Sequence, residues 1–268
     1  MNILSRGLVK TVTLALGLMV CSAQAEEATV KGIDWRYSVV NGAARIDNLN
    51  QICTGKLDIP AKIGTYRVAE VGDGEHPITS FHGPTSIMIP ANVTRIGTFA
   101  FGGNKNIREV SLPPKLTSIP EALFHSCENL SSVRIPVSVK GIGVEAFAEC
   151  RSLKSVVIPE GVKSIGKVAF RDCSGLTSVT VPASVTNIVR YAFSDCPNLV
   201  SVAIPASVVR IGDMAFDKCP KLSCFYTDAD NVDRLKSIAV ANNLERVRVE
   251  ERPAAQMKRK AKGSRAAY

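Results

Sequence analysis

The chain has 268 residues, of which 46% are hydrophobic, and this length is ample for one elongated domain. Its 33 Lys and Arg residues exceed its 24 Asp and Glu residues, which gives a formal net charge of +9 at pH 7. Beyond the first 25 residues no apolar stretch approaches the ~20 residues that a transmembrane helix needs, so the sequence predicts no membrane span.

Residues 1–25 have the pattern of a secretory signal peptide. Arg6 and Lys10 precede an apolar run over residues 12–20, and Ala-Gln-Ala ends the segment at Ala25. We expect cleavage after Ala25, which predicts a protein that is secreted or held at the cell surface. Lipoprotein anchoring through Cys21 is the alternative, and we favour it less because bulky Val20 stands where such sites prefer a small residue.

Residues 26–59 are expected to form an N-terminal β-hairpin cap. Residues 35–40 and 43–46 read as paired strands, and Asn41-Gly42 between them is a dipeptide typical of a tight hairpin turn. Such a cap would close the open end of the repeat region that follows, because exposed strand edges promote aggregation.

A pattern of 23 residues then recurs in fixed register. Each copy is marked by a proline: Pro90, Pro113, Pro136, Pro159, Pro182 and Pro205. Apolar residues recur 3, 6, 11, 17 and 20 residues after each proline. The residue at 6 is always isoleucine, and the one at 11 is always phenylalanine: Phe101, Phe124, Phe147, Phe170, Phe193 and Phe216. A fixed period of this length predicts a solenoid, in which equivalent side chains stack in columns.

Each repeat is expected to form one coil with one short strand. The stretch before each proline reads L-x-x-V-x-I-P and alternates as a half-buried strand does, so successive coils would build a parallel sheet. The Ala-Phe pair lies on the return path, where the spacing suits a turn of 3₁₀ or α helix. We expect the ring to fill the interior of each coil.

The repeat I-P-x-x-V-x-x-I-G-x-x-A-F-x-x-C-x-x-L-x-x-V resembles the BspA-like leucine-rich repeat family of bacterial surface proteins, over residues 60–227. The resemblance implies an α/β repeat solenoid: a right-handed leucine-rich-repeat solenoid of about seven coils, mostly β, with short parallel strands and short helical turns. The first copy is irregular, because Pro60 lies 30 residues before Pro90. Other departures replace a consensus residue: Asn104 for the cysteine, Pro120 and Val189 for the glycine, and Leu123 for the alanine.

Residues 228–250 are expected to form a C-terminal cap of one helix and one strand. Asp230 would begin the helix, Asn242-Asn243 would end it, and residues 246–249 alternate like a last strand. Four apolar residues share one face of that helix: Val232, Leu235, Ile238 and Ala239.

Residues 251–268 are expected to form a flexible basic tail with almost nothing to bury. Its cations are Lys258, Arg259, Lys260, Lys262 and Arg265. A solvated chain end is the interpretation we favour, and electrostatic contact with an acidic envelope polymer is the second. A nucleic-acid contact is disfavoured, because the predicted export and the lack of aromatic residues other than Tyr268 argue against it.

Five of the eight cysteines form a column, one per coil: Cys127, Cys150, Cys173, Cys196 and Cys219. We favour buried thiols that act as small apolar spacers. Adjacent coils about 4.8 Å apart fall within disulfide reach, but equivalent side chains point the same way. Donors in a line do not suit tetrahedral zinc. Outside the column, Cys224 could pair with Cys219 in an oxidising compartment.

No catalytic, cofactor or metal site is predicted. The histidines, His76, His82 and His125, have no recurrent acid or nucleophile beside them, and the carboxylates are scattered. The glycines after the isoleucine column are spaced for turns rather than for a phosphate-binding loop. An enzyme with its site in the irregular first coil, around His76 and His82, remains one alternative.

The outward residues of the strands form the predicted binding face. In coil order they are Ser86 and Met88, Glu109 and Ser111, Ser132 and Arg134, Ser155 and Val157, Ser178 and Thr180, and Ser201 and Ala203. The serine column can be read simply as small residues that suit a tightly stacked sheet. It can also be read as a recognition face, which solenoid sheets commonly provide, with Arg134 and Glu109 as orienting charges.

From the resemblance we expect a non-enzymatic binding module that acts in adhesion or in recognition of an extracellular protein or glycan. One alternative is an envelope structural protein that the basic tail tethers to acidic polysaccharide. Neither hypothesis needs a cofactor, a nucleic acid or a membrane span.

Overall fold

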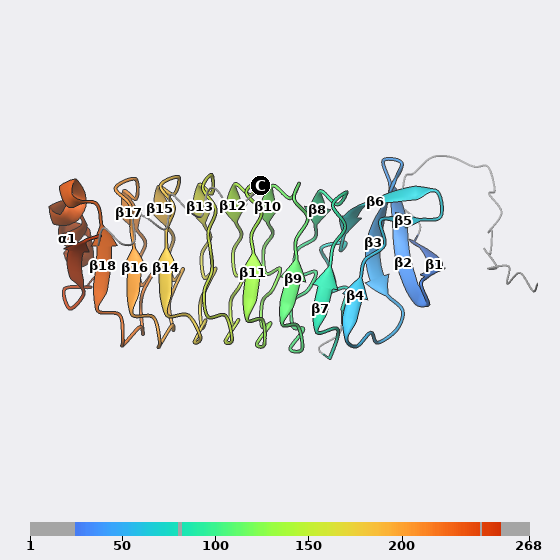
Figure 1. Cartoon of the computed structure of the whole chain (residues 1–268), viewed down its shortest axis with the longest axis horizontal. Coiled ribbons are helices and arrows are strands. Elements are labelled where there is room, and N and C mark those ends of the chain that lie inside the picture. Colours follow the sequence, from blue (N-terminus) through green and yellow to red (C-terminus); the bar gives the residue numbers. More distant parts are fainter. Residues whose placement is uncertain (1–24, 80–81, 242, 253–268) are drawn as a thin grey trace, which may run out of the picture.

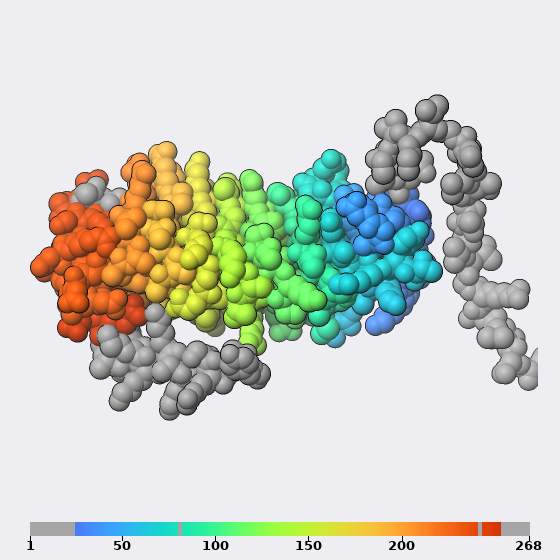
Figure 2. Space-filling view, turned by 90° about the horizontal axis from the view of Figure 1, so that it is seen from above, coloured from blue at the N-terminus to red at the C-terminus, as the bar shows by residue number. Residues whose placement is uncertain are grey.

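The computed structural model describes residues 25–79, 82–241 and 243–252. The predicted signal segment up to Gln24 and the tail after Arg252 lie outside the described residues. The described coils stack side by side into an elongated solenoid, with a cap of strands at the N-terminal end and helix α1 at the other end (Figure 1). Viewed from above, the coils form a continuous row of ridges (Figure 2). This confirms the predicted repeat solenoid.

One side of the solenoid is a parallel sheet to which each coil contributes a short strand or a single bridged residue. Its strands are β4 (Lys56–Asp58), β7 (Ser86–Met88), β9 (Glu109–Ser111), β11 (Ser132–Arg134), β14 (Ser178–Thr180), β16 (Ser201–Ala203), β18 (Cys224–Thr227) and β19 (Arg248–Glu251). The coil between β11 and β14 has no strand in this sheet and is joined to its neighbours by a single bridged residue, Val157. The solenoid has about nine turns rather than about seven, because irregular segments at both ends add coils.

A second parallel sheet, which the sequence did not predict, runs along another side. It contains β10 (Ser118–Ile119), β12 (Gly141–Ile142), β13 (Ser164–Ile165), β15 (Asn187–Ile188) and β17 (Arg210–Ile211), and β8 (Arg95–Ile96) pairs with β6 in the same way. Each strand has two residues, an outward one and the buried isoleucine. Two residues are too few for an alternating pattern to be recognised in the sequence. Most repeat coils therefore contain two strands where we expected one.

The third side consists of hydrogen-bonded turns rather than the expected helical turns. In one coil the amides of Glu145, Phe147 and Glu149 donate to the next coil, while Ala148 donates back to Glu145. Glu145 and Glu149 have left-handed φ values of 55° and 62°, which a helix excludes. Alternate amides therefore bond between coils, and no run of bonds within one coil can form a helix.

Stacked phenylalanine rings fill the centre of the solenoid. The rings from Phe101 to Phe216 are fully or almost fully buried, and successive centroids are 5.2 to 5.8 Å apart. The planes of Phe147 and Phe170 differ by only 4°. Phe225 of β18 then packs against Phe216 at 56° and ends the stack. Each ring thus depends on the coil on either side for its burial.

Glycines between the coils permit close approach rather than turns. A Cβ on Gly166 would lie 2.6 Å from the carbonyl carbon of Gly143 in the preceding coil. A Cβ on Gly212 would lie 2.5 Å from the backbone nitrogen of Arg190. These distances are shorter than van der Waals contact allows, so a side chain at either glycine would push that residue away from the backbone of the preceding coil.

The N-terminal cap is larger than the predicted hairpin. Strands β2 (Ile33–Val40) and β3 (Ala43–Leu49) are antiparallel, and Asn41 and Gly42 between them have φ values of 51° and 75°, as a type I′ turn requires. Strand β1 (Ala25–Val30) adds to the outer side of β2. On the other side β3 pairs with β6 (Tyr66–Val71), which also pairs with β5 (Lys62–Ile63). The cap thereby continues into the first coil.

The C-terminal cap consists of a 3₁₀ turn, η1 (Ala229–Asn231), helix α1 (Val232–Ala241) and strand β19. Leu235 and Ala239 of α1 are buried, as the predicted apolar face requires. The last strand begins at Arg248, two residues later than expected, because the Val247 amide donates to the carbonyl of Leu244 and closes a turn there. It also includes Glu251, and the amide of buried Arg252 donates to the Thr227 carbonyl, so residues 251 and 252 belong to the cap rather than to the predicted tail.

We expect Phe147→Ala to lower the free energy of unfolding by about 3–5 kcal/mol, because the truncation removes ring contacts with both Phe124 and Phe170. Urea unfolding followed by circular dichroism measures the change. A loss below about 1 kcal/mol would contradict the stacked core.

Gly166→Ala should destabilise the protein by about 1–3 kcal/mol, because the methyl group overlaps the backbone of the preceding coil. Gly141→Ala is the matched control: its Cβ would meet nothing nearer than the Ser164 hydroxyl at 3.5 Å. The control should melt within a few degrees of the parent. Equal effects of the two substitutions would refute close coil approach as the reason for Gly166.

Candidate functional site

Alternation along the strands produces the outward face. Val110 and Val133 point inward and are largely buried, while Glu109 and Arg134 beside them are exposed. The parallel register places Glu109 level with Ser86 and Ser132 of the neighbouring coils. Equivalent outward residues therefore stand in two columns along the solenoid, as the sequence predicted.

Half of the predicted face residues line one hollow. It has a volume of about 300 Å³ and lies over β4, β7, β9 and β11. The predicted residues around it are Ser86, Met88, Glu109, Ser111, Ser132 and Arg134. Met88 is 48% exposed, so an apolar side chain is available beside the charges.

The hollow contains opposite charges that are not neutralised within the fold. Neither Glu109 nor Arg134 forms an ion pair with another described residue. Lys56, from β4, also lines the hollow and pairs with Asp58 at 3.2 Å, where both side chains are exposed. Lys56 was missed because the first coil is irregular. The stretch K-L-D-I-P at residues 56–60 matches the strand pattern and could have revealed it.

The remaining predicted residues lie further along the sheet, outside this hollow. Ser155, Val157, Ser178 and Thr180 are exposed, and Val157 retains 77% of its surface. Ser201 is half-buried, and Ala203 is only 6% exposed. Ala203 lies in register between Thr180 and the larger Tyr226, and it offers no useful side-chain surface to a partner. Of the twelve predicted face residues, Ala203 thus contributes the least exposed surface.

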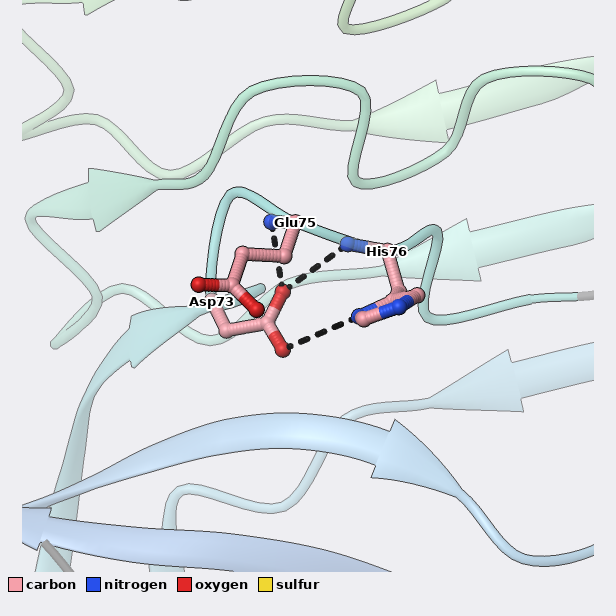
Figure 3. A group of neighbouring side chains, drawn as sticks. All are labelled: Asp73, Glu75 and His76. Carbon is pink, nitrogen blue, oxygen red and sulfur yellow. Dashed lines mark hydrogen bonds and ion pairs between the residues drawn. The ribbon is translucent and has the colours of Figure 1, made fainter.

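The irregular first coil brings three possible metal ligands together (Figure 3). Donor atoms of Asp73, Glu75 and His76 lie within 4.8 Å of one another. One Asp73 oxygen accepts hydrogen bonds from the amides of Glu75 and His76, and the other lies 3.7 Å from His76 Nδ1. We did not predict this set from the sequence, although D-x-E-H over residues 73–76 could have indicated it.

The chemistry of this loop is limited by its exposure and its internal bonds. The His76 side chain retains 69% of its surface, and no hydroxyl or thiol of a described residue is paired with it. Asp73 already uses one oxygen to hold the turn. A divalent cation there would have to complete its coordination with water. The exposed His82 side chain lies on the same coil but is not part of the cluster.

His125 is on a different coil from the other two histidines. Its Nδ1 lies 3.4 Å from the Glu145 carboxylate, and its ring lies 6.1 Å from that of Phe99. This contact bridges two coils, in the same way as the other ion pairs on the turn side. The structure therefore gathers no catalytic group from the three histidines among the described residues.

The column of cysteines is buried and has a hydrogen-bonding role. Each thiol donates to the phenylalanine carbonyl of the preceding coil: Cys150 Sγ lies 3.2 Å from the Phe124 oxygen, and Cys173 Sγ lies 3.2 Å from that of Phe147. The seven described cysteines are free. Burial raises the pKa of the Cys127 and Cys173 thiols, which disfavours the reactive thiolate.

The proposed disulfide between Cys219 and Cys224 is absent from the described structure. Cys219 lies on the side of the coil formed by turns, where its thiol donates to the buried carbonyl of Phe193. Cys224 belongs to β18 and stands in register with Ser201 and Arg248. The two thiols belong to different sides of the coil, although they are close in sequence.

The chain matches the model of the BspA type leucine-rich repeat region in 6 copies, over residues 80–199 and 140–252. No curated protein matches it. No helix among the described residues is both long and apolar enough to cross a membrane.

Solved structures of three bacterial proteins resemble it. A leucine-rich repeat protein from Bacteroides ovatus is 27% identical, with a TM-score of 0.64 over 78% of this chain and 55% of its own. A leucine-rich cell surface protein from Faecalibacterium prausnitzii is 32% identical, with a TM-score of 0.63 over 77% and 55%. A leucine-rich repeat protein from T. pallidum is 28% identical, with a TM-score of 0.66 over 82% and 97%. The chain thus spans about half the length of the first two proteins and nearly all of the third.

Asp73 should make the stability of the protein depend on pH. Burial raises the pKa of its carboxyl, but hydrogen bonds from the amides of Glu75 and His76, together with the His76 side chain, lower it by more, so the net pKa lies below the ordinary 3.8. The ionised form is therefore preferred in the folded state, and this stabilisation is present above the unfolded pKa and lost as the pH falls through the folded one. We expect the stability difference between the parent and Asp73→Ala to be constant above about pH 5 and to shrink as the pH falls below 3.8.

Thermal melting across this pH range measures the difference. Glu75→Ala is the control, because its side chain is exposed in the same loop and its amide still donates to Asp73. A difference for Asp73→Ala that persists unchanged at acid pH would contradict the role of the ionised carboxylate.

Proposed function

The chain belongs to the BspA-type leucine-rich repeat family of bacterial surface proteins, and we propose that it is a secreted or surface-exposed, non-enzymatic binding module. Its ligand is an extracellular protein or glycan, which it recognises through the strand face. The observation that carries this proposal is the hollow over β4, β7, β9 and β11, where Glu109 and Arg134 lie together without ion-pair partners among the described residues.

The backbone around this hollow is suited to recognition because it is held rigidly. Parallel backbone pairing joins β4, β7, β9 and β11, and the buried residues beneath them are part of the main core. Binding costs free energy when side chains become ordered, and the serines on this face lose little rotamer freedom. The preorganised face can therefore use most of its interaction energy for affinity.

The chemistry of the hollow favours a ligand with both charged and apolar groups. Arg134 can bind a carboxylate or sulfate, and Glu109 can accept hydrogen bonds from an ammonium, guanidinium or hydroxyl group. Exposed Met88 offers a flexible apolar contact. The serines of the hollow add hydroxyl groups that can act as donors or acceptors: Ser86, Ser111 and Ser132. This combination supports adhesion or matrix recognition better than it supports a chemical reaction.

Arg134→Ala should weaken binding to the recognised ligand at least tenfold, which corresponds to about 1.4 kcal/mol. Residues 26–268 and a version ending at Arg252 are tested on an array of matrix proteins and glycans at low and physiological salt. Arg210→Ala is the matched control, because it removes the same charge from an exposed position on β17 in the second sheet. It should leave binding unchanged.

Saturable binding by both forms, weakened by Arg134→Ala alone, is the expected result. Binding that is lost with residues 253–268, or with added salt, and that does not respond to Arg134→Ala would contradict the strand-face proposal. In that case the protein would act as an envelope component attached to acidic polymer by its tail. Hydrolysis of an array ligand that His76→Ala abolishes would overturn the non-enzymatic proposal.

A further inference from the structure

A second and larger hollow lies beside the strand face, at the corner where each coil turns into its strand. Its volume is about 690 Å³, and it is lined by residues of four successive coils. Four of these residues occupy equivalent positions, 18 residues after their repeat prolines: Arg108, Ser131, Lys154 and Thr177. Along the solenoid this column alternates between a cation and a hydroxyl group.

Backbone hydrogen bonds between coils are missing beside the same hollow. At this column the amides of Arg108, Ser131 and Val200 each donate to the carbonyl of the preceding coil, at 2.8 to 3.0 Å. The amides of Lys154 and Thr177 make no such bond to a described residue. In the coil that contains Lys154, the strand of the first sheet is reduced to a single bridged residue, Val157. Two backbone N–H groups of residues that line the hollow are therefore without a backbone partner among the described residues.

The cations in the hollow are only partly neutralised. Arg151 is paired with Asp172 at 2.9 Å and with Glu128 at 3.7 Å. The exposed side chains of Arg108 and Lys154 form no ion pair with any described residue, and the hydroxyl groups of Ser152 and Thr177 form no hydrogen bond with one. Positive charge and unused hydrogen-bonding groups thus converge on one concave surface.

We propose that this hollow, here called the corner groove and lined by Arg108, Ser131, Lys154 and Thr177, binds an acidic polysaccharide in which acidic and neutral sugars alternate. Successive coils are about 4.8 Å apart, so the two cations are separated by roughly 10 Å along the solenoid. A sugar unit in an extended polysaccharide is about as long as one coil is thick. An acidic sugar at Arg108, a neutral one at Ser131 and an acidic one at Lys154 would match this period.

The lining favours a glycan over an acidic peptide. Apart from the cations it consists of hydroxyl groups, an amide and a glycine. The Ser131 hydroxyl and the Asn129 amide each donate to a carbonyl of the preceding coil, so they offer a sugar mainly their oxygens. Clustered cations also bind acidic peptides, but here the cations alternate with hydroxyl groups along the column, which matches an alternating glycan better than a continuous acidic peptide. Sugars present many hydroxyl groups, which the unused donors and acceptors can satisfy. Because the groove is open, binding should be weak and should fall with added salt.

The test uses the full chain and four polymers as probes. Hyaluronate carries one carboxylate on every second sugar, polygalacturonate carries one on every sugar, dextran is neutral, and polyglutamate is an acidic peptide. We expect hyaluronate to bind at low salt and dextran not to bind. The double variant R108Q/K154Q should weaken hyaluronate binding at least tenfold, or about 1.4 kcal/mol.

A matched double variant separates the groove from net charge. K140Q/K163Q removes the same two charges from exposed positions four residues after their repeat prolines, outside the groove. It should bind hyaluronate within about twofold of the parent. Both double variants weaken long-range attraction equally, because each removes two positive charges, but only R108Q/K154Q also removes contacts in the groove. Equal losses in the two double variants would overturn the proposal, as would the absence of hyaluronate binding or tighter binding of polyglutamate.

Ser131→Lys provides a gain-of-function test. It turns the alternating column into three successive cations at an exposed position, so preference should shift from hyaluronate towards polygalacturonate. An unchanged preference would refute the matching of charge to coil. The proposal is independent of the strand-face ligand, because R108Q/K154Q tests the corner groove whereas Arg134→Ala tests the face, and either can fail alone.

Discussion

The structure depends on the contact between one coil and the next. The phenylalanine rings are buried only because the neighbouring coils supply rings above and below them, at centroid separations of 5.2 to 5.8 Å. Backbone hydrogen bonds between coils run along all three sides, and the thiols add one more per coil. A single repeat has no core of its own, so the fold is stabilised by the sum of such interfaces, and the caps protect the terminal ones.

The sequence predicted what the period of 23 residues determines. The phenylalanine stack, the strand before each proline and the inward cysteines follow from equivalent residues occupying equivalent places. It did not predict the second sheet, because two-residue strands such as Ser164–Ile165 leave no periodic signal. It also assigned the glycine column to turns. The close approach of Gly166 to Gly143 is a contact between coils, and a reading of local sequence alone does not reveal it.

The candidate surfaces occur where the repeat departs from its own average. The strand-face hollow gathers Glu109 and Arg134 among positions that are otherwise mostly serine, and Lys56 comes from the irregular first coil. The corner groove lies where the amides of Lys154 and Thr177 lose their usual partners. Repetition makes the scaffold rigid, and local exceptions to it supply charge, hollows and unused hydrogen-bonding groups. Individual residues of the face were therefore predictable, but the hollows were not, because they depend on how adjacent coils separate.

Amide hydrogen exchange followed by mass spectrometry tests the dependence on coil stacking most directly. If each coil is stabilised by both neighbours, protection should be highest around the Phe147 and Phe170 coils and should fall towards the two caps. A central coil that exchanges faster than the coils at both ends would contradict the account, because its rings and amides would then not be held by the neighbouring coils.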